Sequence, residues 1–132
     1  MPRITHIALK VNELEKESRL LEEVFGFKYA STVQSVGHVS RHLTDGRVFL
    51  TLMKYESEAS PEALLAGPGT CIHHIGFEVD DPAAYDQAIR DFGCEILGGS
   101  PTKLPVKFRT PDGIVAELLA SDTIPVEKGA SA

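Results

Sequence analysis

The stretch His74-Ile75-Gly76-Phe77-Glu78-Val79 decides the fold, because it repeats His6-Ile7-Ala8-Leu9-Lys10-Val11 at an offset of 68 residues. Two later pairs keep nearly the same spacing, at an offset of 67: Phe25-Gly26 with Phe92-Gly93, and Asp45-Gly46 with Asp112-Gly113. Self-similarity at a fixed spacing indicates two copies of one structural unit. We therefore predict one domain over residues 1–132, composed of module one (1–53), a linker (54–70), module two (71–120) and a tail (121–132).

Each module is expected to begin with a strand, because apolar and polar residues alternate over 7–11 and over 75–79. A helix follows in each module, and Asn12 with Glu15 is typical of a capping box at the start of the first one. Three short strands come after each helix, and the two Asp-Gly pairs favour tight hairpin turns between them. The pattern predicts an α+β fold of two βαβββ modules.

Composition excludes several classes of function. The 132 residues carry 13 Lys and Arg against 19 Asp and Glu, for a net charge of -6, and contain no basic run. Nucleic acids and anionic membrane surfaces both need clustered Lys and Arg, so neither is an expected partner. The polar N-terminus and the lack of a run of about 20 apolar residues predict a cytoplasmic protein.

Two histidines and one glutamate are the first candidates for a functional site. His6 and His74 occupy matching positions of the two modules, on the strand faces opposite the residues that pack on the helices. Glu117 shares a face of the last strand with bulky apolar neighbours, and a carboxylate is costly to bury there unless it is paired or bound to a metal. Two imidazoles and a carboxylate form a facial triad, which suits Fe(II) and also Mn, Ni or Zn.

Three segments resemble the vicinal oxygen chelate superfamily, which includes glyoxalase I, bleomycin resistance protein and the extradiol dioxygenases. The segments are 5–11, 72–80 and 111–119, and the resemblance extends over about residues 3–120. It implies that the sheets of the two modules form an open, cupped barrel and that the protein is a homodimer. It also implies that the partner is a small-molecule substrate, and that His6, His74 and Glu117 hold a divalent metal which chelates two adjacent oxygens of it.

The resemblance is incomplete at a fourth position. Glyoxalase I and the epimerases of the superfamily carry Glu or Gln at the repeat mate of the final glutamate, which is Leu50 here, or Thr51 after a slip of one residue. Because neither side chain can replace that ligand and base, we favour Fe(II) dioxygenase chemistry over a glyoxalase-type lyase, isomerase or epimerase. A non-catalytic protein that sequesters a ligand, as bleomycin resistance proteins do, is the other alternative.

Three more histidines remain to be placed. His38 and His42 alternate with Ser40 on one strand face, where they could act as acid, base or hydrogen-bond donor beside the pocket. His73 is expected on the face opposite His74, as a helix-side or edge residue, although another strand register would exchange the two. The cavity itself is expected to be mostly apolar, with these lining residues: Ala8, Val48, Leu50, Leu52, Val115 and Leu119.

Overall fold

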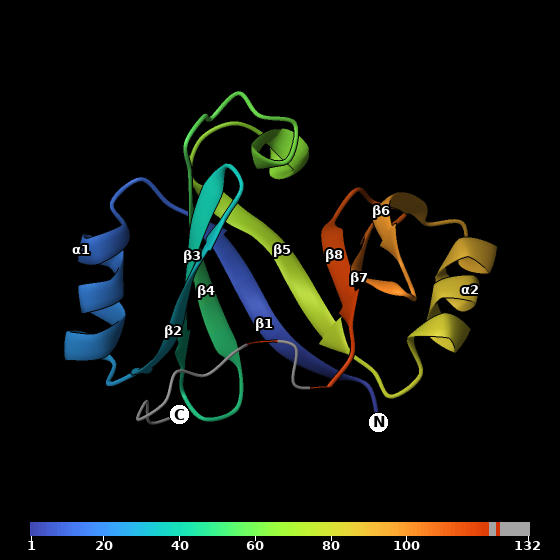
Figure 1. Ribbon diagram of the computed structural model, residues 1–132, viewed down its shortest axis with the longest axis horizontal. Coiled ribbons are helices and arrows are strands. Elements are labelled where there is room, and N and C mark those ends of the chain that lie inside the picture. The colour runs from blue at the N-terminus through green and yellow to red at the C-terminus, as the bar shows by residue number, and fades with distance from the viewer. Residues whose placement is uncertain (122–123, 125–132) are drawn as a thin grey trace.

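A computed structural model describes residues 1–121 and 124, and in these residues eight strands form one mixed sheet (Figure 1). The order of the strands is β2-β3-β4-β1-β5-β8-β7-β6. Their bounds are β1 Arg3–Lys10, β2 Lys28–Ser35, β3 His38–Thr44, β4 Phe49–Tyr55, β5 Cys71–Glu78, β6 Glu95–Ser100, β7 Lys103–Arg109 and β8 Val115–Leu119. Most of the predicted tail, residues 121–132, lies outside the described residues.

The sheet is built from two halves that meet at its centre. β1 pairs antiparallel with β5, while β4 runs parallel to β1 and β8 runs parallel to β5. The sheet does not close on itself, because β2 and β6 lie at its two ends. The helices α1 (Leu14–Arg19) and α2 (Pro82–Phe92) lie at opposite flanks, as Figure 1 shows. The predicted α+β fold of two βαβββ units in an open barrel is confirmed.

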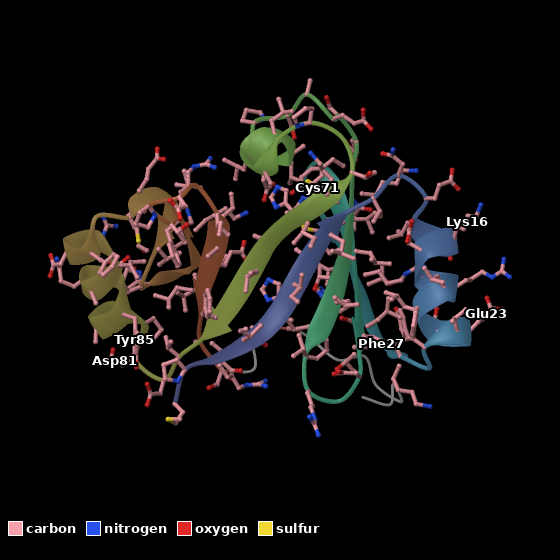
Figure 2. The ribbon with its side chains drawn as sticks, turned by 180° about the vertical axis from the view of Figure 1, so that it is seen from behind. Lys16, Glu23, Phe27, Cys71, Asp81 and Tyr85 are labelled. Carbon is pink, nitrogen blue, oxygen red and sulfur yellow. The ribbon has the colours of Figure 1, made fainter. Side chains whose placement is uncertain are left out.

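The helices pack on the outer face of the sheet and leave the inner face to polar residues. On the α1 side, Leu43 and Leu52 are buried in a cluster that Phe27 packs against (Figure 2). On the α2 side, Val106 and Leu118 belong to the corresponding cluster. Burial of these side chains is the main driving force for folding. The outward-pointing side chains of Lys16 on α1 and of Glu23 just after it, both labelled in Figure 2, are exposed.

The first helix differs from its prediction at its start. α1 begins at Leu14 with Glu13 in the N-cap position, and within the described residues no side chain caps it, so the capping box of Asn12 and Glu15 is wrong. Glu15 instead accepts a hydrogen bond from Arg41 on β3, at 2.8 Å. After Arg19 the helix continues as a π-helical segment, η1 (Leu20–Val24). Glu15 is therefore engaged in a tertiary ion pair with the strand and not in a local cap.

The linker between the halves is anchored close to the inner face of the sheet. Ser60 Oγ accepts a hydrogen bond from the Ala63 amide at 3.2 Å, at the start of a short 3-10 helix, η2 (Ala63–Ala66). Lys10, which is 5% exposed, donates from Nζ to the carbonyl oxygens of Ala63 and Gly67, at 2.6 and 2.7 Å. A buried ammonium group needs such partners. Lys10 thus fixes the linker turn against β1.

The helices do not suggest a membrane-spanning segment. In the part of the chain that the structure describes, none of them is long and apolar enough to cross a bilayer.

Candidate metal centre

The three predicted ligands lie together on the three central strands. His6 (β1) and His74 (β5) have their Nε2 atoms 3.1 Å apart, and Glu117 (β8) places Oε1 3.4 Å from the first and 3.2 Å from the second. All three side chains are buried, with 4–7% of each residue exposed. The structure therefore brings together the three residues that the sequence analysis named as candidate ligands.

Strand register explains how residues so far apart in the sequence meet. β1 pairs His6 with Gly76 and Ala8 with His74, and β5 pairs Gly76 with Glu117. The close approach depends on Gly76, because a Cβ atom there would lie 2.1 Å from Cε1 of His6. The imidazole of His6 thus occupies the space that a side chain at position 76 would fill.

The geometry fits a divalent ion. Zinc-type bonds to nitrogen and oxygen are about 2.0–2.2 Å long, which places neighbouring ligand atoms roughly 3 Å apart. The three distances among Nε2 of His6, Nε2 of His74 and Oε1 of Glu117 are 3.1–3.4 Å. Two imidazoles and one carboxylate also match the ligand preferences of first-row divalent metals and leave further coordination positions open. The residues present can therefore hold such an ion.

Glu117 is held in its charged form despite its burial. Burial is the largest influence and raises the pKa of this carboxyl, but its contacts with the imidazoles of His6 and His74, together with the charge of Lys107, bring the pKa well below its usual value. Lys107 Nζ lies 3.1 Å from Oε2 of Glu117. Burial lowers the pKa of His74, which favours the neutral imidazole that a metal requires. The site thus has the protonation state of a metal centre.

The two halves carry equivalent cross-strand pairs beside the centre. In module one β3 pairs His42 with Thr51, and in module two β7 pairs Lys107 with Glu117. Thr51 stands opposite Ala8 as Glu117 stands opposite Gly76, so Thr51 is the structural mate of Glu117.

The assignment of Leu50 as the mate of Glu117 is therefore wrong, and the slip to Thr51 is correct. The chain runs six positions from Asp45 to Thr51 but only five from Asp112 to Glu117, which shifts the repeat by one residue.

A cavity of about 380 Å³ opens next to the three candidate ligands. Its lining residues are His6, Val33, Ser35, His38, Ser40, His42, Thr51, Met53, Glu62, His74, Pro105, Lys107, Glu117, Leu119 and Ile124. Of the six expected lining residues, only Leu119 is among these described ones, so the predicted set of lining residues is wrong, although most of the surface that lines the cavity is apolar, as expected. The shift of one residue explains part of this difference, because it turns Leu52 to the outer face, where it packs beneath α1.

His38 and His42 both line the cavity, as predicted, and differ in their surroundings. Nδ1 of His42 lies 2.9 Å from Oγ1 of Thr51. Burial, with a smaller effect of the nearby His6, lowers the pKa of His42 to about 4, so its imidazole is neutral at pH 7. His38 places Nδ1 3.7 Å from Oε2 of Glu62. His42 is therefore the neutral base candidate, and His38 lies beside a carboxylate.

Glu62 is a cavity residue that sequence reasoning missed. It belongs to the linker turn, and its Oε1 lies 3.1 Å from Nζ of Lys107. Lys107 therefore connects the carboxylate of Glu62 to that of Glu117. No periodic pattern in the linker pointed to this residue, because its position depends on how the turn folds back over the sheet.

His73 is also placed differently from its prediction. It is 1% exposed, and its Nδ1 lies 2.8 Å from Nδ1 of His74. Its Nε2 lies 2.8 Å from the carbonyl oxygen of Glu62. The assignment as a helix-side or edge residue is wrong, because the pairing of β1 with β5 shifts between Ala8 and Leu9 and interrupts the alternation of strand faces.

The family of the chain is shown by comparison with known proteins. The model of the Glyoxalase/Bleomycin resistance protein/Dioxygenase superfamily matches residues 3–118. The protein belongs to this superfamily, as its repeated strands and the arrangement of its sheet had indicated.

Epimerases are among the proteins that the chain resembles. An ethylmalonyl-CoA/methylmalonyl-CoA epimerase of Cereibacter sphaeroides is 27% identical over an alignment of 128 positions, with 88% of this chain and 96% of the relative covered. The methylmalonyl-CoA epimerase of Streptomyces coelicolor, solved in complex with 2-nitronate-propionyl-CoA, is 25% identical. Its TM-score is 0.74, with 92% of this chain and 98% of that chain covered. A hypothetical protein from Bacillus halodurans has a TM-score of 0.78 and 17% identity, covers 96% and 99%, and shows the fold alone.

Proposed function

We propose that the protein is a divalent-metal-dependent epimerase that moves the proton on the carbon next to the thioester carbonyl of a small acyl-CoA. The observation that carries this proposal is the placement of His42 and Lys107 in equivalent positions of the two halves, on either side of the candidate metal centre. An epimerase must remove a proton from one face of a carbon and return one to the other face. Two polar groups that flank a single cavity suit that task.

The epimerase alternative now has more support than the dioxygenase chemistry favoured from the sequence. That preference rested on the missing fourth ligand, and Thr51 at the fourth position is a true departure. The relatives, however, are named as epimerases of methylmalonyl-CoA and ethylmalonyl-CoA. The structure also supplies groups for proton transfer that the sequence left unassigned, so the lack of a carboxylate on β4 no longer excludes this reaction.

In this proposal His6, His74 and Glu117 hold the ion and fix its position at the base of the cavity. A bound divalent ion supplies Lewis-acid polarisation of a carbonyl oxygen, which acidifies the adjacent C–H group. Fe(II) remains the metal that we predict. The same ligands also accept Mn, Ni or Zn. Lys107 forms an ion pair with the second oxygen of Glu117, and this pair stabilises the charged carboxylate within the buried site.

His42 is the proposed proton acceptor. When Nδ1 carries the ring proton and donates it to Oγ1 of Thr51, the lone pair is on Nε2. The C–H bond then breaks with its electrons remaining on the substrate, and the proton moves to Nε2 of His42. Thr51 occupies the position at which related enzymes of the superfamily carry a metal ligand, and in this proposal it orients the imidazole of His42.

The Lys107–Glu62 pair is the proposed source of the returning proton. It lies in the same cavity but comes from β7 and the linker, whereas His42 comes from β3. The side chain of Glu62 is 42% exposed, so it can exchange protons with water. The new C–H bond forms on the second face of the carbon, and the substrate leaves with inverted configuration and no net change in atoms or electrons.

The proposal is tested by proton exchange in deuterated water. Protein reconstituted anaerobically with Fe(II), Mn(II), Ni(II) or Zn(II) is mixed with methylmalonyl-CoA or ethylmalonyl-CoA, and the α-proton signal is followed by NMR. We expect loss of the signal and inversion of configuration only when metal is present. If all four metal forms leave the α-proton in place, the proposal is wrong, and oxygen uptake with catechols tests the dioxygenase alternative.

The expected homodimer remains a prediction of the family resemblance. Light scattering coupled to size-exclusion chromatography measures the mass in solution, and a mass near twice 14.3 kDa would support it.

A further inference from the structure

A chain of two hydrogen bonds leads from the linker turn to one of the candidate metal ligands. The carbonyl oxygen of Glu62 lies 2.8 Å from Nε2 of His73, and Nδ1 of His73 lies 2.8 Å from Nδ1 of His74. We propose that His73 is a positioning residue, which fixes His74 in the tautomer whose Nε2 atom is free to bind metal. This inference rests on the metal site of the proposed function.

The positions of the protons follow from the chemistry of the three groups. A carbonyl oxygen can only accept a hydrogen bond, so Nε2 of His73 must carry a proton and donate it to Glu62. A neutral His73 then has a lone pair on Nδ1, which can only accept. The proton between the two rings therefore belongs to Nδ1 of His74, and Nε2 of His74 keeps its lone pair. That Nε2 atom is the one that lies 3.1 Å from Nε2 of His6 and 3.2 Å from Glu117.

The supporting ring is itself held firmly. His73 is 1% exposed and lies between the ring of Tyr55, at 5.9 Å between centroids, and the linker turn. The turn is anchored by the buried ammonium group of Lys10 through two carbonyl oxygens. The chain of contacts thus begins at Lys10 on β1 and ends at the metal-facing atom of His74. Outer contacts of this kind orient metal ligands and raise their affinity.

The first-module histidine lacks a corresponding support. Nδ1 of His6 is buried and has no hydrogen-bond partner among the described residues. His6 is held instead by packing over Gly76. The two histidines therefore occupy matching positions of the repeat but are oriented by different means, and a change at position 73 should affect His74 selectively.

Two substitutions at position 73 separate hydrogen bonding from packing. In His73→Gln the amide oxygen can accept from His74 and the amide nitrogen can donate to Glu62, whereas His73→Leu fills similar space and can do neither. The first measurement is long-range ¹⁵N–¹H NMR of the metal-free protein, which identifies the tautomer of each histidine. The second is the Kd for Zn(II) and Mn(II), measured by competition with a chelator. Ile72→Gln, at a neighbouring residue that is 66% exposed, is the matched control.

We expect wild-type His74 to carry its proton on Nδ1, and we expect His73→Leu to lose that preference and to bind metal about 10- to 100-fold more weakly. His73→Gln should recover most of the affinity, and Ile72→Gln should match the wild type. The proposal is overturned if wild-type His74 carries its proton on Nε2, or if the Gln variant binds metal as weakly as a folded Leu variant. Should the Leu variant fail to fold, the wild-type NMR spectrum and the Gln variant still decide.

Both measurements are made without substrate. A normal tautomer and metal affinity combined with no α-proton exchange would therefore refute the proposed function and leave the role of His73 intact.

Discussion

The two halves of the sheet have the same strands in the same order but place different chemistry beside the centre. Module one pairs His42 with Thr51, a neutral imidazole with a hydroxyl group, at 2.9 Å. Module two pairs Lys107 with Glu117, an ammonium group with a carboxylate, at 3.1 Å. The repeated module thus has a neutral pair in the first half, called here the neutral side, and a charged pair in the second, called the charged side. The proposed roles follow this difference, with His42 as the base and Glu117 as a metal ligand.

The charged side needs more support than the neutral one. A buried carboxylate is costly unless it is paired, and Glu117 has Lys107 and two imidazoles within 3.1–3.4 Å. The hydroxyl of Thr51 needs only one hydrogen-bond partner, which His42 provides. Module two therefore supplies the charged ligand and two of the three candidate ligands, whereas module one adds His6 and, in the proposal, a neutral base that can accept a proton.

Removal of the charge from module two should have the largest effect. Glu117→Gln keeps the shape of the side chain but leaves Lys107 without its buried carboxylate. We expect metal binding to fall by more than the roughly 10- to 100-fold that the loss of an outer contact costs, since a ligand itself is lost. Metal per chain, measured by elemental analysis after dialysis, checks this expectation. Metal content equal to that of the wild type would show that Glu117 is not a ligand.

A change on the neutral side should leave the metal in place. His42→Gln removes the proposed base, and general-base catalysis contributes about 10²- to 10⁴-fold, so α-proton exchange should slow by that factor with metal content unchanged. Arg41→Gln is the control, because Arg41 is the next residue on β3 and pairs with Glu15 of α1. Loss of metal in His42→Gln would contradict the separation of roles between the two halves.

The two halves also differ at the residues that face the opposing histidine, Ala8 in module one and Gly76 in module two. Gly76→Ala makes the halves alike, and its new Cβ would meet the imidazole of His6. We expect metal to bind about 10-fold or more weakly, because the ring of His6 must move. Gly98→Ala is the matched control, since nothing lies within 4 Å of a Cβ at that position and its backbone conformation is an ordinary one. Equal affinity in both variants would show that His6 can shift without loss.

The repeat carried most of the information about the fold and the three candidate ligands. Matching positions in matching strands face the same side of a sheet, so His6 and His74 could be placed together from the sequence alone. Glu117 followed from the cost of a carboxylate among apolar neighbours. These inferences rest on local strand geometry, which the alternation of residues reports directly.

Features that depend on one extra residue or on the path of a loop were not predictable in this way. Because the stretch from Asp45 to Thr51 has one more residue than its mate, the offset of the repeat predicted Leu50 at the cavity instead of Thr51. The irregular pairing of β5 with β1 likewise made the predicted face of His73 wrong. Glu62 reaches the cavity only because Lys10 ties the linker turn to β1. The sequence contains each of these residues but no periodic signal for the contacts between them.

The smallest expected effect is a pH dependence that comes from the neutral side. His42 has a pKa of about 4 in the folded protein, because burial and the nearby His6 disfavour its charged form. In the unfolded chain a histidine has a pKa of about 6.5, so between these values the unfolded state binds more protons. The contribution of His42 to the free energy of unfolding is therefore complete above about pH 6.5 and is lost as the pH falls toward 4.

His42→Gln has no such proton to bind, so its stability should depend less on pH. In metal-free protein, urea unfolding at pH 7 and at pH 4.5 should show the wild type losing about 2 kcal/mol more than the variant over this interval. All carboxyl groups are common to both proteins and cancel in the difference. Equal losses would mean that His42 titrates near its ordinary value, and its imidazole would then be partly charged at pH 6–7 and less available as a base.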